Sequence, residues 1–194
     1  MRTDDFDYDL PEELIAQAPA EPRDSCRLLV LHKDDGAVEH RRFTDVLEYL
    51  EPGDLLVANR TRVLPARLIG RKPTGAVAET LLLRRREDLD AMGAVWECLV
   101  HPGKRLRQGA TIEYRAGGLL APENADVVLV GHVLDFVEGS RGGRLVRFEP
   151  QGNRSLDEAI HAVGNVPLPP YITQYKGDPE KYQTVYAMEE EHSA

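Results

Sequence analysis

Two polar segments hold the residue types that could bind a nucleotide or an adenosyl group. In the tetrapeptide 59–62, asparagine and threonine can pair with polar ligand edges, and arginine can grip a phosphate or carboxylate. The segment 171–186 is rich in tyrosines, which offer flat stacking faces with a hydroxyl group. The residues predicted to bind substrate are Asn59, Thr61, Arg62, Tyr171, Tyr182, Gln183, Thr184 and Tyr186. The structural alternatives are a turn stabilised by Asn59 and Thr61, and a proline-braced surface strand.

Prolines fix the backbone that leads into the second segment. Pro167, Pro169 and Pro170 restrict φ and remove backbone donors, so positions 164–172 are predicted to be rigid and extended. Such a backbone would hold neighbouring tyrosine faces in place at low entropic cost.

Standard catalytic and metal-binding patterns are absent from the sequence. It contains no Walker loop, no Gly-x-Gly-x-x-Gly, no nucleophile elbow and no zinc-ligand spacing. The six histidines are scattered. His101 stands beside the basic turn 102–105, where contact with RNA or no role at all is favoured over acid–base work. The catalytic group therefore stays unknown, and no metal is expected.

Cysteine usage and the start of the chain predict a cytoplasmic protein. Cys26 and Cys98 are far apart and are expected to be reduced thiols. The acidic start is unlike a signal peptide, and no apolar run approaches the length of a membrane span.

Positive charge is concentrated in the middle of a chain whose net charge is −9. Residues 64–149 carry 13 basic and 11 acidic side chains, whereas the rest carries 11 basic and 22 acidic ones. Phosphate binding depends on local rather than global positive charge. The residues predicted to bind RNA are Arg84, Arg85, Arg86, Lys104, Arg105 and Arg107. Solvated basic strand faces are the alternative.

The turn signals predict an α/β domain, a mixed sheet with flanking helices, that is interrupted by an inserted β-barrel. Residues 1–64 and 150–194 are assigned to the α/β domain and 65–149 to the barrel. The helices of the α/β domain are expected at 11–17, 44–50 and 156–163, the last one with a capping box at its start. Its strands are expected at 27–32, 38–41 and 55–58. The barrel strands are expected at 66–71, 76–83, 95–101, 111–115, 127–136 and 144–148.

Several segments resemble one known family. These are FDYDLPEELIAQ at 6–17, PRDSCRLLVL at 22–31, GDLLVANRTRVLPARL at 53–68, GNVPLPPYI at 164–172 and YQTVYA at 182–187. They are similar, in the same order, to S-adenosylmethionine:tRNA ribosyltransferase-isomerase of queuosine biosynthesis. The resemblance covers the amino-terminal part of that family, and two later family blocks have no counterpart here. Arg60 stands where the family usually has an acidic residue.

The resemblance implies a transferase-isomerase that acts on tRNA. Such an enzyme moves the ribosyl moiety of S-adenosylmethionine onto a 7-aminomethyl-7-deazaguanine base, giving epoxyqueuosine and releasing adenine and methionine. S-adenosylmethionine is then a co-substrate, and no further cofactor is expected. We expect this chain to be an inactive amino-terminal fragment that self-associates without spanning a membrane. The alternative is a non-catalytic tRNA-binding module.

Overall fold

The computed structural model describes residues 2–117, 121–122, 124–169, 171–173, 177–187 and 192–193. The chain forms two compact units. The amino-terminal unit comprises Met1–Asn59 with Leu168–Gln183, and the barrel unit comprises Arg60–Pro167 with Thr184–Ala194. By this grouping, residues 60–64, 150–167 and 184–194 associate with the barrel strands rather than with the amino-terminal residues.

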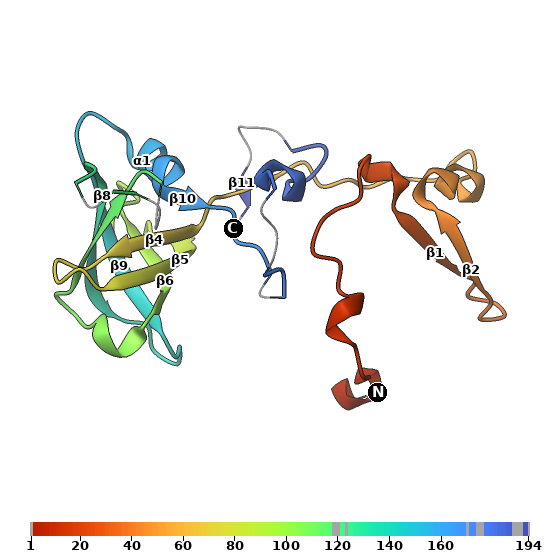
Figure 1. Cartoon of the computed structure of the whole chain (residues 1–194), viewed down its shortest axis with the longest axis horizontal. Helices are drawn as coiled ribbons and strands as arrows, with labels where there is room; N and C mark the ends of the chain where they lie inside the picture. Colours follow the sequence, from red (N-terminus) through yellow and green to blue (C-terminus); the bar gives the residue numbers. More distant parts are fainter. Residues whose placement is uncertain are drawn as a thin grey trace. The chain divides into compact units, whose positions relative to one another are not determined.

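A closed barrel of six antiparallel strands dominates the barrel unit (Figure 1). The barrel closes where the first strand pairs with the fourth in chain order, with Arg71 opposite Glu113. A short seventh strand, β10 (Gly164–Asn165), extends the sheet beside the first. The prediction of a β-barrel at residues 65–149 is confirmed. Around the barrel the strands are β4 (Arg67–Arg71), β5 (Val77–Arg85), β6 (Val95–His101), β9 (Gly143–Pro150), β8 (Val127–Phe136) and β7 (Thr111–Arg115).

Alternating apolar side chains fill the barrel interior. On β7, Ile112 and Tyr114 are fully buried while their neighbours face outward. The Tyr114 hydroxyl pairs with Thr80 Oγ1 at 2.7 Å, and its ring lies 6.1 Å from that of Phe148. Burial raises the pKa of Tyr114, so the hydroxyl stays protonated. This buried hydroxyl pair is thus satisfied inside the barrel.

One α-helix, α1 (Leu156–Val163), packs on the barrel. Its predicted capping box is confirmed, because Ser155 Oγ accepts from the Glu158 amide and Glu158 Oε2 accepts from the Ser155 amide at 2.7 Å. The hydrogen bonds from Ser155 lower the pKa of Glu158. Ala159, Ile160 and Val163 are buried and join the barrel core. A two-residue strand β3 (Arg62–Val63) pairs with β11 (His192–Ser193), and a 3₁₀ helix spans Gly103–Arg105.

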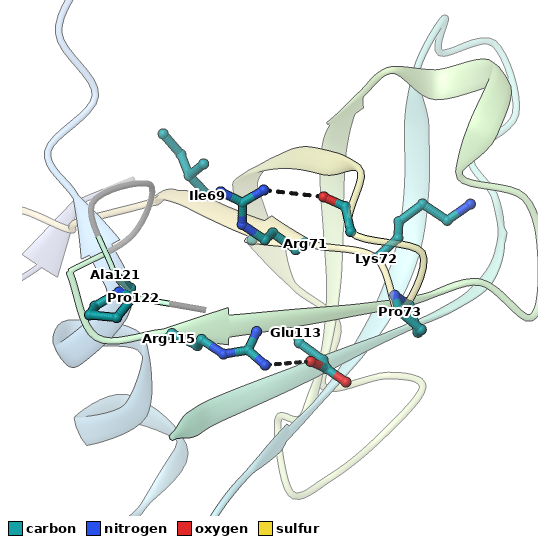
Figure 2. Close-up of a pocket in the computed structure, with 10 residues that line it drawn as sticks. Ile69, Arg71, Lys72, Pro73, Glu113, Arg115, Ala121 and Pro122 are labelled. Carbon is teal, nitrogen blue, oxygen red and sulfur yellow. Dashed lines mark hydrogen bonds and ion pairs between the residues drawn. The ribbon is translucent and has the colours of Figure 1, made fainter. Parts of the chain in front are cut away.

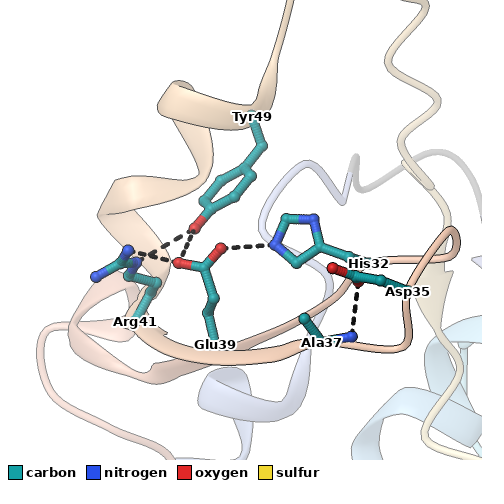
Figure 3. A network of polar contacts seen from close by, with 6 residues as sticks. All are labelled: His32, Asp35, Ala37, Glu39, Arg41 and Tyr49. Atoms are coloured by element: carbon teal, nitrogen blue, oxygen red, sulfur yellow. Dashed lines mark hydrogen bonds and ion pairs between the residues drawn. The ribbon is translucent and has the colours of Figure 1, made fainter.

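The amino-terminal unit contains one β-hairpin, formed by β1 (Arg27–Leu31) and β2 (Val38–Arg42). A polar network lies beside it (Figure 3). Glu39 receives hydrogen bonds from His32 at 2.6 Å, from Arg41 at 2.5 Å and from the Tyr49 hydroxyl at 3.3 Å. The His32 contact, followed by the charge of Arg41, lowers the pKa of Glu39. The helices of this unit are all 3₁₀: Thr3–Phe6, Glu12–Leu14, Arg23–Ser25, Phe43–Tyr49 and Pro179–Tyr182.

The predicted mixed sheet with flanking helices is not found in the described part of the chain. The helices expected at 11–17 and 44–50 are short 3₁₀ segments, and no strand forms at 55–58. Short helices and isolated strands are marginal unless they bury an apolar face. Here Leu47 is 74% exposed and Val57 88%, so that burial is missing. No helix in the described residues has the length and apolar character needed to cross a bilayer.

Candidate functional site

The arginine triplet at the end of β5 consists of Arg84, Arg85 and Arg86, and two of these arginines form ion pairs with carboxylates of this chain. Arg86 donates two hydrogen bonds to Asp88, at 2.8 and 2.7 Å, and this contact holds the pKa of Asp88 at about 2. Arg85 pairs with Asp157 at 2.5 Å and lies 4.9 Å from the centre of the Trp96 ring. Two of the three guanidinium groups are therefore neutralised by this chain, which weakens the triplet as a phosphate site.

The second basic segment is different. Lys104, Arg105 and Arg107 are exposed on the 3₁₀ turn after β6 and the loop that follows it. Hydrogen bonds in this segment involve backbone carbonyl groups. Arg107 Nε donates to the Lys104 carbonyl at 3.4 Å, and the Arg105 carbonyl accepts from Lys72 Nζ at 3.0 Å. Within the described residues, none of the three lies in an ion pair with a carboxylate. Their charge is available to an external anion.

A separate pocket lies where β4 meets β7 (Figure 2). Two of its arginines are held by partners within the pocket lining. Arg71 donates to the Gly75 carbonyl at 3.2 Å, and Arg115 forms an ion pair with Glu113 at 3.0 Å. Because an acidic side chain shares this pocket with its cations, the pocket is a poorer match to an anion than the 104–107 segment.

Three predicted substrate-binding residues are brought together in the amino-terminal unit. Gln17 Nε2 donates to the Tyr171 carbonyl at 2.9 Å, and the Tyr182 hydroxyl donates to the Gln17 carbonyl at 3.5 Å. Arg23 Nη1 donates to the Gln183 carbonyl at 2.8 Å. Gln183 is only 5% exposed, whereas Tyr171 is 57% exposed. Tyr171 is therefore accessible to a ligand.

Gln17 and Arg23 were not among the predicted site residues. They tie the 171–183 segment to the start of the chain, and Gln17 also accepts from the Thr173 amide at 2.9 Å. A signal was present, since both lie in segments that carry the family resemblance. Polar side chains near prolines are common in sequences. Their presence at 17 and 23 therefore did not predict hydrogen bonds to the distant 171–183 segment.

The other predicted substrate-binding residues occupy several positions. Asn59 is exposed at the end of the amino-terminal unit. The remaining four belong to the barrel unit, where Thr61 and Thr184 are half-buried, Arg62 lies in β3 and Tyr186 is 67% exposed. Cys26 and Cys98 are free thiols, and burial raises the pKa of Cys98. The described residues hold no cluster of three or more metal-ligating side chains.

Comparisons with known proteins agree over nearly the whole chain. The family described as "Queuosine biosynthesis protein" matches residues 3–194. An S-adenosylmethionine:tRNA ribosyltransferase-isomerase from Symbiobacterium thermophilum is 49% identical over 190 residues, which cover 97% of this chain and 50% of that protein. A protein of the same name from Desulfitobacterium hafniense is 48% identical over 190 residues, again 97% of this chain and 50% of the relative.

A solved structure is also similar. The crystal structure of an S-adenosylmethionine tRNA ribosyltransferase from Thermotoga maritima is 43% identical, covering 79% of this chain and 47% of that chain, with a TM-score of 0.34. The chain spans about half the length of the curated relatives it matches.

Proposed function

Because the chain belongs to the family of queuosine biosynthesis proteins, we propose that it forms part of a tRNA-modifying ribosyltransferase-isomerase. The observation that carries this proposal is the match over residues 3–194, supported by 49% identity to a relative named for that activity. The donor is S-adenosylmethionine and the acceptor is a 7-aminomethyl-7-deazaguanine base in tRNA. The reaction takes place in the cytoplasm and yields epoxyqueuosine, adenine and methionine.

The chemistry explains what this chain must contribute. The sulfonium of S-adenosylmethionine acidifies the adjacent ribose carbon, so a positioned base can remove a proton there and start the loss of adenine. The acceptor amine then adds to the ribosyl carbon, and rearrangement to an epoxide expels methionine. This sequence requires neither metal nor redox cofactor. It requires ordered reactants and a pocket that excludes water.

We assign binding rather than proton transfer to the predicted site residues. Tyr171 and Tyr186 are exposed aromatic rings on a proline-braced backbone, and they offer stacking faces to adenine or to the acceptor base. Asn59, Thr61 and Arg62 are assigned polar contacts to the substrate in the longer enzyme. Residues 1–59 and 168–183 form one part of its α/β domain. We also assign substrate binding to three further residues of the 171–186 segment, Tyr182, Gln183 and Thr184.

The barrel is proposed to bind tRNA through its basic segments. Arg84, Arg85 and Arg86 form one segment and Lys104, Arg105 and Arg107 the other. Their phosphate contacts would make binding weak and steeply dependent on salt.

The exposed apolar face of the amino-terminal unit is proposed to pack against the remainder of the longer enzyme. Leu55 and Val57 are 85% and 88% exposed, and Gln183 is the sole buried side chain among the described residues of this unit. Without that cover, the 194-residue chain is expected to self-associate as its concentration rises. Light scattering over a concentration series measures this.

A matched pair of variants tests the same point. Leu55→Ser with Val57→Ser should shift the chain toward monomer. Leu89→Ser with Met92→Ser, at exposed apolar positions of the barrel unit, should not. A parent chain that stays monomeric at the highest concentration reached would refute the exposed-face proposal.

The proposed reaction is tested with a chimera. The 194 residues are joined to the portion of the Symbiobacterium thermophilum relative that they do not match, and transfer of a ribose label from S-adenosylmethionine to tRNA is measured. Label on the tRNA supports the proposal.

A further inference from the structure

A hollow lies at the end of the barrel where β6 and β8 finish and β9 begins. The basic and aromatic residues that line it are His101, Lys104, Arg107, Phe136, Arg141 and Arg144. Among the described residues that line it, there is no aspartate or glutamate. The hollow therefore concentrates positive charge on a concave surface, which strengthens its field toward an anion.

A buried arginine builds this site. Arg144 is only 5% exposed, and its three guanidinium nitrogens donate to the carbonyl oxygens of Leu106, Gly143 and Gly103, each at 2.7 Å. The guanidinium carbon also lies 4.2 Å from the centre of the Phe136 ring. These bonds tie the 103–106 turn to the start of β9, so the walls of the hollow are held in place.

The hydrogen bonds of Arg144 to carbonyl groups satisfy three of its five N–H groups but leave its charge without a carboxylate. Burial of a charge is costly unless an opposite charge lies close by. Five other barrel arginines do have such partners. The pairs are Arg67 with Glu79, Arg85 with Asp157, Arg86 with Asp88, Arg115 with Glu113 and Arg147 with Asp90. Within the described residues, Lys104, Arg107 and Arg141 resemble Arg144 in having no carboxylate in ion-pair contact.

An exposed aromatic ring completes the surface. Phe136 lines the hollow with 54% of its area exposed, although it stands at the end of a barrel strand whose other apolar residues are buried or half-buried. Cations that track a backbone, combined with an aromatic face for a base, are the usual means of binding unpaired nucleotides. A free phosphate has no aromatic face and would not stack on the Phe136 ring.

We propose that this hollow is the main RNA-binding site of the chain and takes unpaired nucleotides of tRNA. Lys104, Arg107 and Arg141 contact phosphates, Arg144 supplies a fixed buried charge, and Phe136 stacks on a base. The choice of tRNA rests on the proposed function, whereas the phosphate and base chemistry rests on the hollow itself. The arginine triplet on β5 is then a minor contributor, since Arg85 and Arg86 already hold carboxylates.

Binding of a tRNA transcript to the 194-residue chain, followed by fluorescence anisotropy across a salt series, tests the proposal. For Lys104→Gln with Arg141→Gln, the affinity at about 0.1 M salt should fall by on the order of tenfold or more, and the salt slope should drop by about two. The control is Arg115→Gln with Arg147→Gln, which removes the same charge from positions paired with carboxylates and should change affinity by only about twofold. An equal loss in both variants would overturn the assignment.

A third variant separates RNA from bare phosphate. Phe136→Leu should weaken binding of the transcript by on the order of tenfold, the effect of losing one stacked base, while competition by tripolyphosphate stays unchanged. Unaltered transcript binding by Phe136→Leu would show an anion site that does not take RNA bases. Thermal unfolding of each variant checks the fold. No turnover is needed, so failure here leaves the proposed reaction standing, and failure of the reaction leaves this binding result intact.

Discussion

Replacing Gly70 with alanine is expected to lower the free energy of unfolding of the barrel by about 3 kcal/mol. An added Cβ would lie 2.6 Å from the Glu113 carbonyl oxygen, 2.6 Å from the Tyr114 ring and 2.8 Å from an Ile112 methyl. The first of these atoms is backbone and cannot rotate away. Gly70 precedes Arg71, whose pairing with Glu113 closes the barrel, so relief of the clash would open the β4–β7 junction.

Gly131→Ala is a matched control in the same core. Its Cβ would meet only side-chain atoms of Tyr114, Val146 and Phe148, at 3.2 to 3.3 Å. Those side chains can shift by a few tenths of an ångström, so a cost of about 1 kcal/mol is expected. Urea unfolding followed by the fluorescence of Trp96, the single tryptophan, measures both. Equal stability losses would contradict a backbone-specific role for Gly70.

The second large effect concerns the proposed adenosyl or base contact. In the chimera described above, Tyr171→Ala is expected to slow adenine release more than tenfold, which corresponds to about 1.4 kcal/mol of transition-state stabilisation. The tyrosine ring is 57% exposed, and its backbone carbonyl is held by Gln17 whatever the side chain. The loss would therefore reflect the missing ring rather than a collapsed segment.

Phe43→Ala supplies the comparison for Tyr171. It removes another exposed aromatic ring from the amino-terminal unit, at 45% exposure, and should leave the rate within about twofold of the parent. If Tyr171→Ala behaved in the same way, the tyrosine would be part of the scaffold only.

Local patterns were sufficient to predict the barrel. Strands at 95–101, 111–115 and 127–136 match the observed bounds, because alternation of inward apolar and outward polar residues is dictated by a closed sheet with one buried face. The helix at 156–163 was also predictable, since Ser155 and Glu158 have the spacing of a capping box. The barrel strands and this helix could be predicted because each depends on residues that are close together in the sequence.

Long-range partners decide what the sequence could not predict. The run Leu55, Leu56 and Val57 reads as a buried strand, but all three are exposed here, because burial depends on a surface that the described chain does not provide. The arginine triplet 84–86 is predicted to bind RNA, but its pattern could not show that Asp157, 72 positions beyond Arg85, pairs with that arginine. Arg144 is not among the residues predicted to bind RNA, because the three carbonyl groups that it binds become neighbours only when the barrel closes.

Adenine release from S-adenosylmethionine by the chimera, in the presence of tRNA carrying the 7-aminomethyl-7-deazaguanine base, is the most direct test of the proposed function. The 194-residue chain alone is expected to release none, since it spans about half the length of its relatives and a reactive intermediate needs a fully enclosed pocket. The chimera is expected to release adenine only when that tRNA is present. A folded chimera that binds tRNA but releases no adenine would contradict the transferase account and favour a non-catalytic tRNA-binding module.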